Sequence, residues 1–232
     1  MPAARLPSSS FTRLDGVSAQ AEPTTNSLER TWWLRLGMVF TDPKTVFAWL
    51  RDDTDAAAQA RQEPVLLVGF LAACAGVLTS NGISHALDDF GLDGVDLAVV
   101  VMFATLIYGI VGYFFVGALV YVGEQLADGL GSYRRARHIL AFACAPLALS
   151  LVLWPVRLAL YGSDNFKSGG SDSGTGGAIF EGIETAVVLW CFALLVLGIR
   201  TANGWSWRRT LVAAAVPAIV PVLAFARAYG AI

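Results

Sequence analysis

The stretch that decides the fold is "LAVVVMFATLIYGIVGYFFVGALVYV", residues 97–122. It contains no charged residue. A helix needs about 20 consecutive apolar residues to cross the hydrocarbon core of a bilayer. We therefore predict that residues 97–122 form a transmembrane helix, one long enough to tilt in the membrane.

Four further apolar runs flank this one in the sequence, at residues 64–80, 138–161, 178–199 and 211–229. The chain of 232 residues is 56% hydrophobic and 15% charged, with a mean hydropathy of +0.59. A soluble domain carries about 25% charged residues, and these runs lack the polar face of a soluble helix. Because lipid satisfies no backbone hydrogen bond, each span must be helical. The sequence predicts an all-α, multi-pass integral membrane protein with five transmembrane helices.

The distribution of basic residues predicts the orientation. Seven Lys and Arg precede the first span, three lie between the second and third, and three between the fourth and fifth, so that thirteen of the 16 share one side. Basic residues concentrate in cytoplasmic loops. We expect a cytoplasmic N-terminus and an extracytoplasmic C-terminus, in the plasma membrane of a prokaryote.

The segment before the first span divides into two parts. Residues 1–28 are polar and aperiodic, which predicts a disordered cytoplasmic tail. Residues 29–62 predict amphipathic interfacial helices, the second with Asp42 as N-cap and Pro43 at its first position. These helices either cover the ends of the spans or lie in lipid. Residues 63–232 then form the five-helix transmembrane domain.

Aromatic and basic residues gather on the predicted cytoplasmic face. Arginine attracts anionic headgroups, and tryptophan favours the membrane–water interface. We expect this face to bind membrane lipids, a cytoplasmic protein partner or a second copy of the chain. The net charge of −2 argues against nucleic acid. The candidate residues are Trp32, Trp33, Tyr133, Arg134, Arg135, Arg137, Trp205, Trp207, Arg208 and Arg209.

Ionisable residues and prolines within the spans favour a second interpretation. Candidate ion-pair residues are Glu124, Arg157, Glu181, Glu184 and Arg227, and candidate helix kinks are Pro146, Pro155, Pro217 and Pro221. Transporters build substrate sites from broken helices. The alternative function is therefore a small transporter or channel that uses the kinked spans three to five.

Signals of catalysis are missing from the sequence. It has no nucleophile elbow, phosphate-binding loop or HExxH motif. Its three cysteines lie far apart in apolar runs, and its acidic loops lack calcium-binding spacing. We predict no enzymatic activity, no metal site and no cofactor.

Three segments resemble the Yip family of five-span membrane proteins. They are "TDPKTVFAWL" at residues 41–50, "GSYRRARHILAFACAP" at residues 131–146 and "LGIRTANGWSWRRTL" at residues 197–211. The resemblance implies a non-enzymatic membrane scaffold, and eukaryotic members bind Rab-type GTPases in vesicle traffic. The composition favours a prokaryotic member. The matched positions imply cytoplasmic-face residues at Pro43, Phe47, Tyr133, Arg134, Pro146, Gly204 and Trp205.

Overall fold

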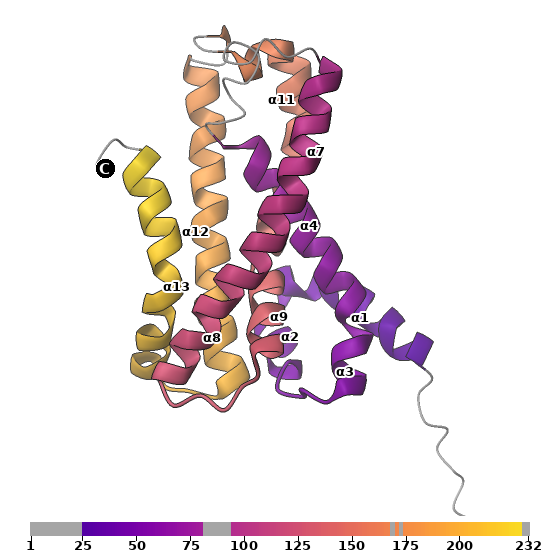
Figure 1. The fold of residues 1–232 in the computed structure, drawn as a ribbon, viewed down its shortest axis with the longest axis vertical. Helices are drawn as coiled ribbons and strands as arrows, with labels where there is room; N and C mark the ends of the chain where they lie inside the picture. Colours follow the sequence, from indigo (N-terminus) through magenta and orange to yellow (C-terminus); the bar gives the residue numbers. More distant parts are fainter. Residues whose placement is uncertain (1–24, 81–93, 168–169, 172–173, 229–232) are drawn as a thin grey trace, which may run out of the picture.

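The computed structural model describes residues 25–80, 94–167, 170–171 and 174–228, and these residues contain helices and no β-strand (Figure 1). Three short helices precede the long ones: α1 (Thr25–Thr41), α2 (Pro43–Trp49) and α3 (Asp55–Ala60). The long helical stretches are α4 (Gln62–Leu78), α7 (Gly94–Val111), the π-helical turn η1 (Gly112–Val116), α8 (Gly117–Leu126), α9 (Tyr133–Ala143), α10 (Ala145–Ser150), α11 (Leu153–Tyr161), the 3₁₀ turn η2 (Gly162–Phe166), α12 (Thr175–Asn203) and α13 (Trp207–Ala228).

Three helical stretches are long and apolar enough to cross a membrane: Gly94–Leu126, Tyr133–Phe166 and Thr175–Asn203. They coincide with the second, third and fourth predicted spans. The first predicted span coincides with α4, which is apolar but only 17 residues long. The fifth coincides with α13. The prediction of an all-helical membrane protein is therefore confirmed.

The third stretch is broken where its prolines lie. Cys144 separates α9 from α10, and residues 151–152 separate α10 from α11. Pro146 and Pro155 each fall in the first turn after a break, where the missing N–H of proline leaves no hydrogen bond unmade. In contrast, α13 continues as one helix through Pro217 and Pro221.

Helix α9 forms the centre of the packed core. Ile139, Ala141, Phe142 and Ala143 are all buried. Helices α4, α8 and α12 pack around this helix. It therefore contacts protein on most of its surface.

The short helices α1 and α2 cover one end of the bundle. The predicted cap of α2 is confirmed, because Asp42 Oδ1 accepts a hydrogen bond of 3.4 Å from the Thr45 N–H and Pro43 opens the helix. Val46 and Phe47 are buried, and α2 packs along α12. Helix α2 therefore packs against the bundle along α12. Residues 1–24 of the predicted tail lie outside the described residues, and α1 begins at Thr25.

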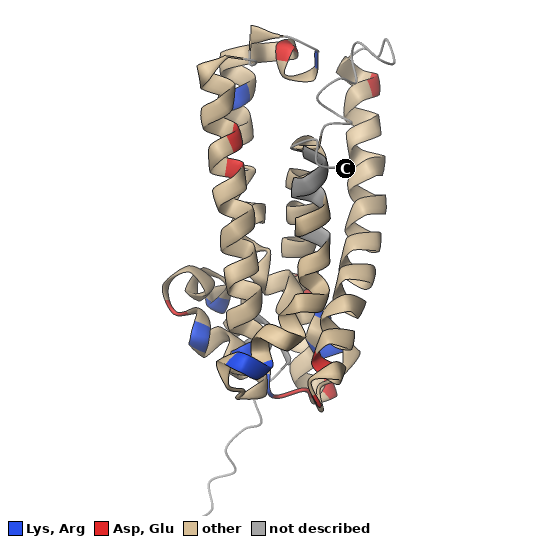
Figure 2. Ribbon diagram, turned by 90° about the vertical axis from the view of Figure 1, so that its left-hand side faces the viewer, with Lys and Arg blue, Asp and Glu red and all other residues tan. Residues whose placement is uncertain are grey.

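Basic residues gather at the same end (Figure 2). We call it the basic end and define it by a set of described residues. They are Arg35, Lys44, Arg51, Arg61, Arg134, Arg135, Arg137, Arg200, Arg208 and Arg209. Helix α11, which contains Arg157, lies at the opposite end of the described bundle (Figure 1), and Lys167 follows the turn η2 after it.

Candidate lipid-binding pocket

Arg61, just before α4, is completely buried at the basic end. Its Nε donates a hydrogen bond of 2.8 Å to His138 Nδ1, and its Nη1 donates one of 2.7 Å to the Asp52 carbonyl. Its Nη2 lies 3.4 Å from Asp53 Oδ1. Burial lowers the pKa of Arg61, while the nearby Asp53 carboxylate acts in the opposite direction. This arginine ties the linker between α2 and α3 to α9.

Arg134 reinforces the same connection from α9. Its Nη1 lies 2.7 Å from Asp55 Oδ1, and its Nη2 donates a hydrogen bond of 2.7 Å to the Asp53 carbonyl. Asp55 is in the first turn of α3, where a negative charge also favours the helix dipole. The two terminal nitrogens of Arg134 are therefore engaged within the protein.

Arg135 takes part in a buried polar network that joins three helices. Its Nη2 donates to Asn203 Oδ1 at 2.5 Å, and Asn203 Nδ2 donates to Glu124 Oε1 at 2.7 Å. Glu124 is completely buried, and its second carboxylate oxygen has no hydrogen-bond partner among the described residues. The structure thus places Asn203 between Arg135 and Glu124. Glu124 is one of the candidate ion-pair residues of the sequence analysis.

Two further arginines contact backbone carbonyls or aromatic rings. Arg209 Nε donates to the Ala127 carbonyl at 2.5 Å, and its Nη2 donates to the Asp128 carbonyl at 2.7 Å. Arg209 thereby caps the end of α8. Arg137 lies over the rings of Tyr113 and Tyr133, with its guanidinium carbon 5.0 and 4.7 Å from their centroids. Neither arginine is a freely extended surface side chain.

The candidate tryptophans occupy different environments. Trp32 is only 4% exposed and packs against Phe142, with ring centroids 5.6 Å apart, so it contacts the protein core. Trp33, on the same helix, is 39% exposed. Trp207 is exposed and lies against Arg200, whose guanidinium carbon is 4.4 Å from the ring centroid. Trp33 and Trp207 therefore remain accessible.

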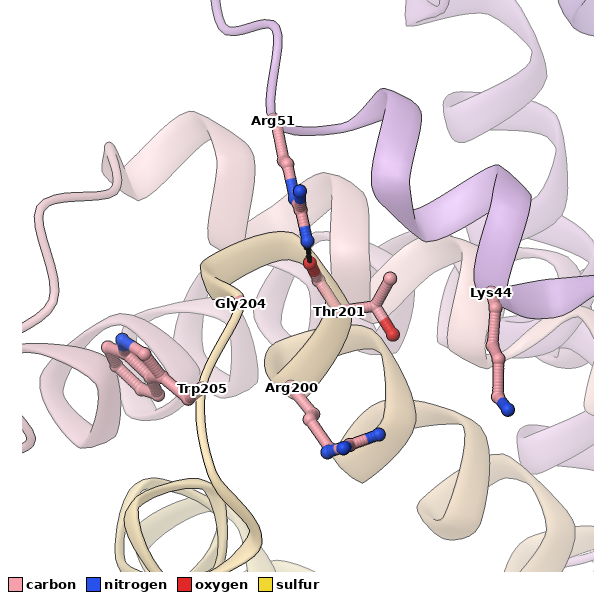
Figure 3. A pocket seen from close by; sticks show the side chains of 6 residues that line it. All are labelled: Lys44, Arg51, Arg200, Thr201, Gly204 and Trp205. Atoms are coloured by element: carbon pink, nitrogen blue, oxygen red, sulfur yellow. Dashed lines mark hydrogen bonds between the residues drawn. The ribbon is translucent and has the colours of Figure 1, made fainter.

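A pocket of about 270 Å³ opens between α2 and the end of α12 (Figure 3). Three basic side chains line it, contributed by Lys44, Arg51 and Arg200. The other lining residues are Thr201, Gly204 and Trp205, so no acidic residue from the described part of the chain takes part. Among the described residues, none of the three basic side chains forms an ion pair. The pocket is therefore positively charged and open to an anion.

The end of α12 gives the pocket its shape. Gly204 adopts φ 68° and ψ 28°, the left-handed conformation that closes a helix. The N–H of Trp205 donates to the Arg200 carbonyl at 3.1 Å, which completes a Schellman motif. Arg51 donates to the Thr201 carbonyl through Nε at 2.9 Å and through Nη2 at 2.7 Å (Figure 3). Arg51 thereby compensates the negative end of the helix dipole and holds the end of α12, which carries Arg200, beside α2, which carries Lys44.

The candidate residues at the opposite end form a separate group. Arg157 Nη1 lies 2.8 Å from Glu184 Oε1, and Arg157 Nε donates to Asn165 Oδ1 at 3.0 Å. Glu181 is exposed, and the side chain of Arg227 lies outside what the structure describes. The two ends thus carry separate charge clusters.

Sequence signals were weak for several residues that matter in this geometry. Lys44, Arg51, Arg61 and Arg200 enter the sequence analysis only as charges that set the orientation, and Asn203 carries no signal there. Arg51 meets Thr201 across 150 residues and Arg61 meets His138 across 77, so no local spacing marks these contacts. Among the described residues, no group of three or more His, Cys, Asp or Glu could hold a metal ion.

The fold and the charge distribution define an integral membrane protein built from helices. Comparison with protein families shows that the Yip1 domain matches residues 37–227. The chain belongs to the Yip1 family. No curated protein and no solved structure matches the chain.

Proposed function

We propose that this protein is a non-enzymatic five-span membrane scaffold that binds anionic lipid headgroups in the pocket at its basic end. The observation that carries the proposal is the pocket of Lys44, Arg51 and Arg200, which no acidic side chain lines. Three cations around one cavity form a site for a phosphate group, since arginine and lysine are the usual phosphate ligands in proteins.

The position of the pocket favours a ligand from the membrane. It lies at the end of α12, a helix long and apolar enough to span the bilayer. Trp205 and Trp207 follow the end of this helix, and tryptophan favours the interface where headgroups lie. The ring centroid of Phe40, at the end of α1, lies 5.8 Å from the ring centroid of Trp190 on α12. The segment that leads into α2 therefore also lies beside this span.

The five-span topology and its orientation are part of the proposal. Helices α4 and α13 supply the first and fifth spans. The positive-inside rule places the basic end in the cytoplasm together with the N-terminus, since thirteen of 16 basic residues belong to that side. We place the protein in the plasma membrane of a prokaryote on the composition of its sequence.

The size of the pocket favours a headgroup over a protein partner. A stable protein interface needs an extended surface of about 800 Å² on each partner, whereas this site is a concave pocket with six lining residues. A transporter gains no support from it, because transporters bind substrates near the bilayer midplane and this pocket lies at one end of the bundle. We therefore propose lipid binding.

Isothermal titration calorimetry on the detergent-purified protein tests the proposal by measuring its affinity for a lipid probe. The probe is dihexanoyl phosphatidic acid, and dihexanoyl phosphatidylcholine is the neutral comparison. We expect the double variant Lys44→Gln/Arg200→Gln to bind the anionic probe about 30-fold more weakly, since each basic residue contributes about 1 kcal/mol to headgroup binding. Arg51 is left intact because it also caps α12.

Arg208→Gln is the matched control. It removes the same charge from an exposed residue of the basic end that does not line the pocket. Its affinity should equal that of the unchanged protein. Equal affinity in the double variant, or no preference for the anionic probe, would contradict the proposal. A protein partner lost from the double variant with unchanged lipid affinity would assign the pocket to that partner instead.

A further inference from the structure

A second cavity, of about 330 Å³, lies between α4 and α7 and has mainly apolar walls. Leu66 and Phe70 form one wall, and Leu106 and Ile110 form the other. All four side chains are exposed large hydrophobics. In a protein that crosses a bilayer, such a surface faces lipid chains, so this groove opens sideways into the hydrocarbon region.

Glycines keep the groove open. A Cβ atom built at Gly69 meets nothing within 4 Å, and one built at Gly109 meets only the Cβ of Ala73, at 3.2 Å. Both glycines line the cavity, one on each wall. The absence of a side chain at Gly69 gives a slender apolar ligand room between the helices, and Gly109 lets α7 approach α4 closely at Ala73.

Buried hydroxyl groups without partners face the same cavity. Thr105 lines it and is 1% exposed, yet its Oγ1 has no hydrogen-bond partner among the described residues. The hydroxyl of Tyr113, another lining residue, is also buried without a described partner. Buried polar groups in native proteins are normally hydrogen-bonded, so the hydroxyl of Tyr113, whose ring lies under Arg137, points to a ligand with polar atoms at that end of the groove.

Arg137 supplies a positive charge to the groove. Its guanidinium carbon lies 5.0 and 4.8 Å from the ring centroids of Tyr113 and Phe114, both of which line the cavity with it. No described residue forms an ion pair with the side chain of Arg137, and its buried Nε has no described hydrogen-bond partner. A partly buried cation without an acidic partner is costly, and an anionic ligand would neutralise it.

The charged and the apolar lining residues occupy different ends of the groove. Thr105 and Tyr113 are eight residues apart along one helical stretch, a length of about 12 Å at 1.5 Å per residue. Tyr113 and Phe114 belong to the π-helical turn η1, and such turns are frequent at functional sites. Arg137 lies at the η1 end, so the groove leads from a charged end into apolar walls.

We propose that this groove holds one acyl chain of an anionic phospholipid from the surrounding bilayer, with the phosphate on the guanidinium of Arg137. The apolar walls accept the chain, and the unpaired cation selects the charge of the headgroup. The site lies on α4, α7, η1 and α9 and shares no residue with the pocket of Lys44, Arg51 and Arg200. It is therefore a second lipid site, independent of the proposed headgroup pocket.

Native mass spectrometry of the purified protein tests the groove. The full chain is incubated in mild detergent with equimolar palmitoyl-oleoyl phosphatidylglycerol and phosphatidylcholine, and the retained lipid is quantified. We expect preferential retention of phosphatidylglycerol. Arg137→Gln should lower this preference about fivefold, the loss expected for one headgroup contact of about 1 kcal/mol. Arg137→Lys should keep most of it, because the charge remains.

Two glycine variants of α4 test the apolar part without touching Arg137. In the Lys44→Gln/Arg200→Gln background, which removes the headgroup pocket, Gly69→Leu places a side chain inside the groove and should abolish retention of both lipids. Gly76→Leu is the matched control, since a Cβ there also meets nothing within 4 Å but the residue does not line the cavity. It should retain lipid normally.

The outcomes separate the two lipid sites. Undiminished retention in Gly69→Leu, or an equal loss in Gly76→Leu, would overturn the groove proposal. So would an unchanged lipid preference in Arg137→Gln. Lys44→Gln/Arg200→Gln should leave retention in the groove intact, so that failure of the headgroup pocket and failure of the groove are distinguishable.

Discussion

The Nε of Arg61 and the Nδ1 of His138 are joined by a buried hydrogen bond of 2.8 Å, although 77 residues separate them in the sequence. Arginine has no acceptor and stays protonated in proteins, so Nδ1 is the acceptor and carries no proton. This contact connects the start of α4 to α9 at the basic end. Arg61 therefore has a structural role within the Yip1 domain of this chain.

Arg61→Leu should destabilise the protein by about 3–5 kcal/mol, because removal of one member of a buried polar group leaves its partners unpaired. The partners left behind are His138 Nδ1 and the Asp52 carbonyl. The free energy of unfolding in mixed micelles measures the effect. Arg208→Leu, an exposed arginine at the same end, should change it by less than about 0.5 kcal/mol. Equal stabilities of the two variants would refute the structural role.

Asn203→Leu should lower the free energy of unfolding by about 2–3 kcal/mol, since it removes the hydrogen bond to the buried carboxylate of Glu124. The second change Glu124→Met should restore part of the loss, because it removes the buried charge left without a partner. A double-mutant cycle on unfolding free energies gives the coupling. Strictly additive effects would show that the bridge contributes nothing.

Gly198→Ala tests the packing of α2 against the bundle. A Cβ atom at this position would lie 2.8 Å from Phe47 Cε1 and 2.9 Å from Ile139 Cγ2. Overpacking of this kind costs about 1–3 kcal/mol, which thermal unfolding would report. Phe47→Leu in the same chain should recover part of the loss. An unchanged unfolding temperature in Gly198→Ala would mean that α2 does not pack as described.

Substitutions at Gly204, which has a positive φ in the left-handed turn after α12, should lower the free energy of unfolding by different amounts. Gly204→Ala should destabilise the protein by roughly 1–2 kcal/mol, the cost of a left-handed conformation for a residue with a Cβ atom. Gly204→Asn should cost less, because asparagine tolerates a positive φ better than alanine does. Both variants should also weaken binding of dihexanoyl phosphatidic acid, since Gly204 lines the pocket. Identical unfolding free energies of the two variants would argue against strain at this turn.

Thiol labelling tests the proposed orientation. In a chain whose three native cysteines are replaced by serine, Gly174→Cys should react with an impermeant reagent in intact cells, and Ser206→Cys only after lysis. The structure favours these positions, because Ser206 is exposed and a Cβ at Gly174 meets nothing within 4 Å. Reaction of Ser206→Cys in intact cells would reverse the orientation.

The helices could be predicted from the sequence because the length of an apolar run is itself the physical requirement for crossing a bilayer. The cap at Asp42 was predictable for a similar reason, since capping depends on neighbouring residues. Which face of a helix meets protein is decided by tertiary packing. Trp32 illustrates this, since its sequence context resembles that of a lipid-facing residue, yet Trp49 and Phe142 enclose it.

The pockets could not be predicted, because each joins residues that only the folded chain brings together. Arg51 and Thr201 are 150 residues apart. The groove depends on Arg137 lying against Tyr113 and Phe114, and on a π-helical turn that no sequence rule indicated. The predicted basic residues Arg134, Arg135 and Arg209 instead bind the protein itself.

The network around Asn203 has a consequence for biosynthesis. Glu124 and Asn203 are separated by 79 residues, and a ribosome that adds about 5–20 residues per second needs about 4–16 s to make that stretch. During this interval the carboxylate of Glu124 has no Asn203 to bind, and the hydrocarbon interior offers no substitute. We therefore expect the end of α8 to stay at the aqueous boundary until α12 has emerged and Asn203 can bind Glu124.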